Sequence, residues 1–159
     1  MNSSPNQTFY SSPVGILHLT ANDEWLTAAH FSDEKPGTSA HQSDHAVIQQ
    51  AVRQLDEYFE GRRTTFDLPL APAGTDFQQS VWTKLQEISF GQTITYGELA
   101  ERLGDMNKVR AVGKANGQNP IPVIIPCHRV IGADNKLVGY AGGIERKRYL
   151  LQHEGALLL

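Results

Sequence analysis

The chain has 159 residues, enough for one domain or two small units, and its 40% apolar content excludes disorder over the whole length. Its single cysteine, Cys127, excludes an intrachain disulfide, and the lack of a signal-peptide pattern or of an apolar run of about 20 residues predicts a cytoplasmic protein. The net charge of −3 divides into −6 over residues 1–76 and +3 over residues 77–159, so a polyanionic partner is expected to meet the second half.

The first half begins with strands. Two apolar-rich runs, residues 9–20 and 25–32, are separated by residues 21–24, where Asn and Asp favour a turn, so we expect a hairpin of two strands. A polar stretch over residues 33–43 is expected to be a surface loop. A further short strand over residues 65–70 is expected to rejoin the sheet.

One helix is expected between that loop and the last strand. Apolar residues recur there every four positions, at Val47, Ala51, Leu55 and Phe59. This period predicts a helix over residues 44–59, with Ser43 or Asp44 as its N-cap and Gly61 just beyond its end.

A segment with the composition of a linker separates the two halves of the chain. Two prolines and a glycine over residues 69–75 predict a linker, because they continue neither a helix nor a central strand. We therefore expect an N-terminal β-rich supporting domain over residues 1–70, a linker over residues 71–76, and a C-terminal domain over residues 77–159.

Three helical segments open the second half. The first has Phe77, Val81, Leu85 and Ile88 on one face, with Thr75 or Asp76 as cap and Gly91 as stop. Two short helices follow over residues 96–103 and 107–116, around a turn that contains Gly104. This is the pattern of a helix-turn-helix, although an ordinary helical hairpin has the same spacing and is favoured on spacing alone.

The chemistry is expected around the single cysteine. Three prolines precede Cys127 within residues 119–126, so we expect an extended segment that leads the chain out of a core. His128 and Arg129 follow directly, and both residue types favour a reactive thiolate. Cys127 as a small buried apolar residue remains the alternative.

Other polar residues are weaker candidates. A base needs an orienting partner, and Glu154 is one carboxylate that would hold His128 in a single tautomer. Arg110 would contact a phosphate or enter a base stack, or be an ordinary solvated side chain. His41 and His45 would have the i,i+4 spacing of a metal pair in a helix, but they have no Cys partner and lie in a loop-like setting, so we predict no metal site.

The region around Cys127 resembles one known family. Residues 126–130, Pro-Cys-His-Arg-Val, are similar to the active-site motif of the O6-alkylguanine-DNA alkyltransferases, or methylated-DNA–protein-cysteine methyltransferases. Further segments match that family in order and spacing: Gly74–Gln78, Val81-Trp82, Thr95–Ala100, Arg110–Gly113, Asn119-Pro120, Gly139-Tyr140, Gly142-Gly143 and His153–Gly155. The resemblance is strong from about residue 74 to the C-terminus and looser over residues 1–70.

The resemblance implies an α+β fold. A ribonuclease-H-like β-sheet unit would form the N-terminal part, and a mostly helical unit with a helix-turn-helix would form the C-terminal part.

The resemblance also implies four catalytic roles. Cys127 would accept the alkyl group, His128 would take the thiol proton through a water, Glu154 would orient His128, and Tyr96 would hydrogen-bond guanine at N3 and protonate it as it leaves.

The resemblance further implies binding roles. The residues implied to bind the flipped base or shape its pocket are Val130, Tyr140, Ala141 and Asn119; Asn119 would also be a hinge between the recognition helix and the active-site segment. The residues implied to bind DNA are Arg110, Thr95, Ala111 and Gly113, with Arg110 filling the stack where the base was.

The implied activity is DNA repair by direct reversal. The protein would flip O6-alkylguanine, with O4-alkylthymine as a second candidate, out of double-stranded DNA and transfer the alkyl group irreversibly to Cys127, once per molecule. No cofactor is implied, because the damaged base supplies the alkyl group, and the protein is expected to act as a monomer, with cooperative binding on DNA left open.

This sequence departs from the family pattern at a few positions. Ser89 stands where proline is common and Thr95 where serine is common. Ala141 replaces a serine found in some members, which removes a hydroxyl near O6. The zinc site that some members build from cysteines in the N-terminal unit is not expected, because Cys127 is the only cysteine.

Three other functions are compatible with part of the pattern. An alkyltransferase-like protein that binds the lesion without repairing it would lack the cysteine. A cysteine hydrolase would not need the helix-turn-helix, Tyr96 or Arg110. A transcription regulator would need base-reading polar side chains where residues 109–115 are mostly small and apolar. The alkyltransferase function accounts for all these features together.

Overall fold

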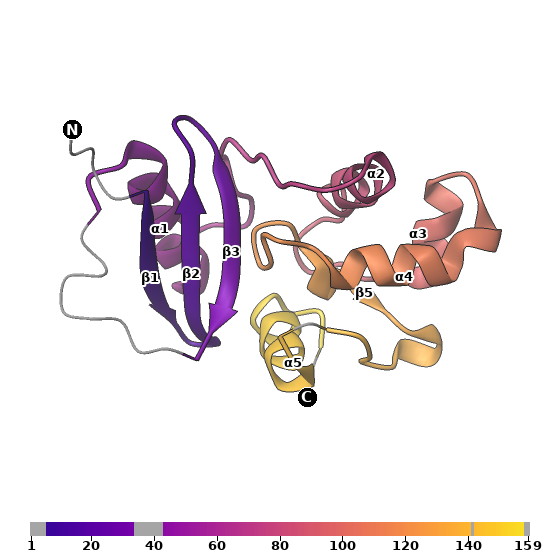
Figure 1. The fold of residues 1–159 in the computed structure, drawn as a ribbon. Coiled ribbons are helices and arrows are strands. Elements are labelled where there is room, and N and C mark those ends of the chain that lie inside the picture. Colours follow the sequence, from indigo (N-terminus) through magenta and orange to yellow (C-terminus); the bar gives the residue numbers. More distant parts are fainter. Residues whose placement is uncertain (1–5, 34–42, 141, 158–159) are drawn as a thin grey trace. The chain divides into compact units, whose positions relative to one another are not determined.

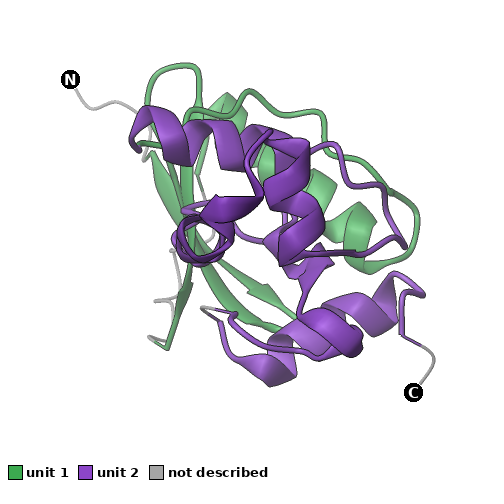
Figure 2. Cartoon of the chain, turned by 90° about the vertical axis from the view of Figure 1, so that its right-hand side faces the viewer, with its two compact units in different colours: residues 1–73 green, residues 74–159 purple. Residues whose placement is uncertain are grey.

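The computed structural model describes residues 6–33, 43–140 and 142–157 (Figure 1). The chain divides into two compact units, Met1–Ala73 and Gly74–Leu159 (Figure 2). His41, Ala141 and most of the loop expected over residues 33–43 lie outside the described residues. Within the described ranges, no helix has the length and apolar character needed to cross a membrane.

The first unit is a three-stranded antiparallel sheet covered by one helix. The strands β1 (Gln7–Ser12), β2 (Gly15–Ala21) and β3 (Leu26–Ser32) lie in the order β1-β2-β3, and α1 (Ala46–Phe59) packs against them (Figure 1). The core between sheet and helix is built from buried side chains of both layers: Leu17, Leu19, Leu26, Ala29, Ile48, Ala51, Leu55 and Tyr58. The expected N-terminal β-unit is confirmed.

The strand expected over residues 9–20 is wrong, because this run forms two strands joined by a tight turn at Pro13 and Val14. Pro13 has no N–H to donate to a ladder, and Gly15 adopts a positive φ of 116°, which few other residues tolerate. Ser12 closes the turn, since its hydroxyl accepts from the amide of Val14 at 3.1 Å and donates to the carbonyl of Gly15 at 2.6 Å.

The N-cap of α1 also differs from the expectation. His45 is the cap, and its Nδ1 accepts from the amide of Val47 at 3.2 Å, while the hydroxyl of Ser43 accepts from the amide of His45. The helix therefore starts at Ala46 rather than at residue 44. Histidine is not among the usual capping residues, so propensity alone favours Ser43 or Asp44.

The strand expected over residues 65–70 is wrong as well. Only a single parallel bridge between Leu26 and Leu70 joins this segment to the sheet. The amide of Leu26 donates to the carbonyl of Pro69 at 2.8 Å, and the amide of Ala71 donates to the carbonyl of Leu26 at 2.9 Å. Pro69 cannot donate to a ladder, which limits the pairing to one residue.

The second unit is mostly helical. Its main helices are α2 (Asp76–Leu85), α3 (Tyr96–Arg102), α4 (Val109–Gly117) and α5 (Ile144–His153). The described residues of this unit also form three short 3-10 turns, η1 (Met106–Lys108), η2 (Cys127–Arg129) and η3 (Ala133–Asn135), and the strands β4 (Ile94–Thr95) and β5 (Val130–Ile131). The helix-turn-helix is confirmed: α3 and α4 pack together across a turn in which Gly104 has a φ of 91°.

Local sequence signals fix the starts of α2 and α3. Each begins with a capping box, in which the threonine hydroxyl accepts a hydrogen bond from the backbone amide of the third residue after it. The side chain of that third residue in turn accepts a hydrogen bond from the threonine amide. Thr75 pairs in this way with Gln78, and Thr95 with Glu98. The expected Thr75 cap is confirmed.

One buried indole connects α2 to α4. Trp82 is almost fully buried, and its Nε1 donates to the carbonyl of Ala115 at 2.9 Å. Gly74 lies so close that a β-carbon there would come within 2.5 Å of the Trp82 ring. The indole therefore holds the C-terminal half of α4 against α2.

The capping box of α2 leads to a stability prediction. Replacing Thr75 with alanine should lower the free energy of unfolding by about 1 kcal/mol, because the amide of Gln78 loses its acceptor. Thr83→Ala removes an exposed threonine inside the same helix and should change it far less. Urea denaturation followed by circular dichroism measures both, and equal losses would contradict the role of the cap.

Candidate active site

A short parallel pairing places Tyr96 beside the cysteine segment. Ile94 of β4 lies opposite Val130 of β5, and Tyr96 begins α3 one residue after β4 ends. Cys127 begins η2, which runs directly into β5. The start of the first helix of the helix-turn-helix and the nucleophile are therefore brought together by the same two-stranded sheet.

The segment before Cys127 is not extended as expected. It is a compact turn, in which the amide of Ile125 donates to the carbonyl of Ile121 at 2.9 Å and Val123 has a φ of 72°. A β-branched residue is strained in this region of φ, so the surrounding contacts must hold it there. Asn119 supplies two of them, since its Oδ1 accepts from the amide of Ile121 at 2.9 Å and its Nδ2 donates to the carbonyl of Ile125 at 2.8 Å.

Cys127 lies in a buried environment that favours the protonated thiol over the thiolate. The residue is 5% exposed, and burial raises the pKa of its thiol to about 11. A hydrogen bond from Asn119 and the positive charge of Lys147 act in the opposite direction and lower that pKa. Arg129, which the sequence suggested as the activating cation, points elsewhere.

The side chain of Arg129 belongs to a buried ionic network with His128 and Glu154. Glu154 is the C-cap of α5, and its Oε2 accepts from His128 Nε2 at 2.8 Å. Arg129 donates to both carboxylate oxygens, at 2.8 and 2.9 Å, and also to the carbonyl of Ile88. The structure thus brings together His128 and Glu154, the two residues that the sequence paired as base and orienting carboxylate.

The network determines which nitrogen of His128 is basic. Burial alone would raise the pKa of Glu154, but the bonds from His128 and Arg129 outweigh it and hold that pKa well below its ordinary value. The carboxylate is therefore ionised and only accepts, so His128 Nε2 carries the proton. Burial lowers the pKa of His128, which leaves Nδ1 as an unprotonated acceptor with no protein partner among the described residues.

Lys147 is a site residue that the sequence did not reveal as one. It is fully buried, and its Nζ donates to the carbonyls of Val130 at 2.6 Å and Val138 at 2.7 Å. The Tyr96 hydroxyl also donates to the Val138 carbonyl, at 3.0 Å. Burial lowers the pKa of Lys147 to about 8, although a negative charge on Cys127 would raise it.

A signal for Lys147 was present in the sequence. It lies three residues after Ile144 and four before Leu151, which is the spacing of the buried face of a helix. Charged residues at such positions are rarely buried without a partner. A lysine on that stripe therefore indicates a paired cation in the interior.

Of the residues expected to bind the base, the structure describes Tyr140, Val130 and Asn119, and these lie around this centre. Tyr140 is buried, which raises its pKa well above the ordinary value, and the charge on Cys127 raises it further. Val130 offers its carbonyl to Lys147, and Asn119 holds the turn before the nucleophile, as described above.

Of the residues expected to bind DNA, two are exposed on α4 and two make contacts within the protein. Arg110 is the second residue of α4, and both Arg110 and Ala111 are exposed. Ala111 and Lys114 line a groove of about 240 Å³ between α4 and the start of α2. Gly113 instead faces the ring of Tyr96, and Thr95 uses its hydroxyl as a helix cap.

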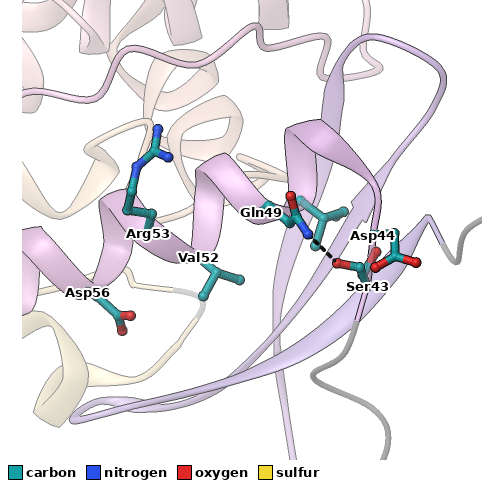
Figure 3. Close-up of a pocket in the computed structure, with 7 residues that line it drawn as sticks. Ser43, Asp44, Gln49, Val52, Arg53 and Asp56 are labelled. Carbon is teal, nitrogen blue, oxygen red and sulfur yellow. Dashed lines mark hydrogen bonds between the residues drawn. The ribbon is translucent and has the colours of Figure 1, made fainter.

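A larger pocket, of about 540 Å³, lies on α1 in the first unit (Figure 3). Its polar groups do not converge: Arg53 and Asp56 point to different sides of the helix, and Gln49 donates to the carbonyl of Ser43. None of the predicted site residues lines it. The described part of the chain also holds no group of three His, Cys, Asp or Glu side chains placed to bind a metal ion.

Comparison with known proteins agrees with this geometry. The family model "6-O-methylguanine DNA methyltransferase, ribonuclease-like domain" matches residues 7–72, and "6-O-methylguanine DNA methyltransferase, DNA binding domain" matches residues 76–156. The chain belongs to the 6-O-methylguanine DNA methyltransferase family. The resemblance inferred from residues 126–130 is thereby confirmed.

Relatives of the same family are similar over nearly the whole chain. A methylated-DNA–protein-cysteine methyltransferase of Methanosarcina acetivorans is 45% identical over 92% of this chain and 96% of its own. One from Mycobacterium tuberculosis is 48% identical over 90% of this chain and 88% of its own. The crystal structure of the Mycobacterium tuberculosis O6-methylguanine methyltransferase matches with a TM-score of 0.83, 46% identity and coverage of 95% and 93% of the two chains.

The buried network predicts a change in pH dependence. Glu154→Gln should shift the pH–rate profile of Cys127 alkylation by iodoacetamide to higher pH. The carboxylate stabilises the imidazolium that forms when His128 takes the thiol proton, so its loss raises the apparent pKa of the thiol.

Glu145→Gln is the control, because it removes an exposed carboxylate from α5 and should leave the profile in place. Thermal unfolding of each variant shows that the folded protein is being measured. A profile that stays unchanged in Glu154→Gln would remove this carboxylate from the mechanism.

Proposed function

We propose that this chain repairs DNA by transferring an alkyl group from O6 of guanine, and in second place from O4 of thymine, irreversibly to Cys127. The observation that carries the proposal is an arrangement within one unit of a buried thiol, the ionised Glu154 and a neutral imidazole whose Nδ1 has no partner among the described residues. Family membership agrees with it, and the 46% identical relative from Mycobacterium tuberculosis has been solved in complex with DNA.

The proposed reaction is one displacement. His128 Nδ1 takes the proton of Cys127, through a water, and the thiolate attacks the alkyl carbon. The new S–C bond forms as the C–O6 bond breaks, and the electron pair passes into the guanine ring. Tyr96 gives its proton to N3 and becomes a phenolate, and the thiol proton carried by His128 then neutralises this phenolate, so both side chains end in their starting forms. Because a thioether does not hydrolyse, each molecule acts once.

The buried position of Cys127 requires the base to leave the duplex. An alkyl group on a stacked base is out of reach of a thiol that is 5% exposed, so the nucleotide must be flipped into the site. Extrusion costs a few kcal/mol, which Arg110 offsets by filling the gap in the stack. Arg110 and Ala111 are exposed near the start of α4, the helix that would enter the groove.

One copy of the chain holds every residue in this scheme. We therefore propose that the protein acts as a monomer on double-stranded DNA. We also propose that it acts in the cytoplasm, as the sequence predicts. The amide of Ala141 would approach O6, Tyr140 would wall the pocket, and the carbonyls of Cys127 and Val130 would read the exocyclic amine.

Intact-mass spectrometry tests the proposal directly. After incubation with a duplex that contains one O6-methylguanine, the protein should gain the mass of one CH₂ group, located on the peptide with Cys127 and saturating at one per molecule. Cys127→Ser should bind the same duplex and gain nothing. An unchanged wild-type mass with binding would indicate a recognition module, and an unchanged mass without binding would favour a hydrolase.

The role of Arg110 can be tested separately. Arg110→Ala should slow repair in duplex DNA by at least about tenfold but leave attack on free O6-benzylguanine nearly unchanged, because only the duplex has a gap to fill. Arg148→Ala is the matched control, since it removes a positive charge outside the helix-turn-helix. Equal losses on the two substrates would exclude a gap-filling role for Arg110.

A further inference from the structure

Asn116 is a buried polar residue to which neither the sequence nor the family motif assigns a role. It lies near the C-terminal end of α4 and is 1% exposed. Its Nδ2 donates to the carbonyl of Cys127 across a long contact of 3.4 Å, and its Oδ1 has no hydrogen-bond partner among the described residues.

The turn of α4 that bears Asn116 lies against Tyr96. The Tyr96 ring packs on Gly113, one turn before Asn116, where a β-carbon would lie 3.6 Å from the ring. Burial raises the pKa of Tyr96, and a negative charge on Cys127 raises it further, whereas a hydrogen bond from Asn116 acts in the opposite direction. The amide therefore favours the phenolate form of this tyrosine.

A second buried amide shows what a purely structural role looks like. Gln54 in α1 is 3% exposed, and both ends of its side chain are bonded to the backbone of Asp67, at 3.0 and 2.8 Å. Asn116 has no such complete pairing. Because an unpaired buried acceptor is costly, leucine would be the more stable choice at this position unless the amide serves the site.

We infer that Asn116 is a positioning residue for alkyl transfer, which ties the Cys127 carbonyl and the Tyr96 hydroxyl to the helix that carries Arg110. The inference rests on the proposed function. In the transfer step the O–H bond of Tyr96 breaks and an N3–H bond forms on the leaving guanine, so negative charge grows on the phenolic oxygen. The N–H of Asn116 stabilises that charge, and α4 thereby holds both the proton donor and the nucleophile segment.

A double-mutant cycle tests the inference. Asn116→Leu should slow single-turnover methyl transfer from duplex O6-methylguanine by about tenfold, because the proton donor becomes weaker. In a Tyr96→Phe background the same substitution should change the rate by less than about twofold, since the group on which Asn116 acts is absent. Alkylation of Cys127 by iodoacetamide, which needs no proton donor, should stay within about twofold throughout.

Two further variants keep the test decisive if Asn116→Leu folds poorly. Asn116→Asp keeps the size and polarity but sets a carboxylate against the growing phenolate, so it should slow transfer at least as much. Gln54→Leu removes the matched buried amide of the first unit and should lower the unfolding temperature without changing the transfer rate of the folded protein.

The outcomes separate the two proposals. If the wild-type protein transfers no methyl group, the proposed function fails. If the wild-type protein transfers normally but Asn116→Leu has no effect, or has the same effect with and without the Tyr96 hydroxyl, the role of Asn116 is overturned.

Discussion

A single buried carboxylate organises the chemistry of the second unit. Glu154 accepts three hydrogen bonds from His128 and Arg129, and an ion taken out of water is stable only when it is paired in this way. Through Arg129 the network reaches the carbonyl of Ile88, beyond the end of α2. The end of α5, the turn that bears the nucleophile and the segment after α2 are therefore fixed to one another by the same charge.

The burial that supports this network has a cost in reactivity. It raises the pKa of the Cys127 thiol to about 11, so the free protein holds a thiol rather than a thiolate. Proton removal then depends on His128, whose lowered pKa keeps it neutral and able to accept. Lys147 adds a positive charge near the sulfur while it bonds two backbone carbonyls. The same low dielectric that keeps the thiol protonated in the free protein strengthens each of these electrostatic interactions.

The sequence predicts best where the cause is local. The capping threonine Thr75 and the paired helices of the helix-turn-helix follow from nearby residues, and the family motif indicates both the N-terminal β-unit and the His128–Glu154 pair. Long-range partners decide the rest. Nothing near residue 147 shows that its ammonium meets the carbonyls of Val130 and Val138, and three prolines suggest an extended segment where contacts to Asn119 impose a strained turn at Val123.

That strained turn also limits what can be transplanted. The five residues from Pro126 to Val130 are easily found by a sequence search and include the base His128, yet the groups that orient and tune them come from elsewhere: a carboxylate after α5, an ammonium within α5 and amides from the end of α4 and just beyond it. Grafted into another scaffold, the pentapeptide would relax and keep only an ordinary cysteine. For protein engineering, the pentapeptide alone is therefore not a portable site, because the groups around it come from α4 and α5 of the unit that begins at Gly74.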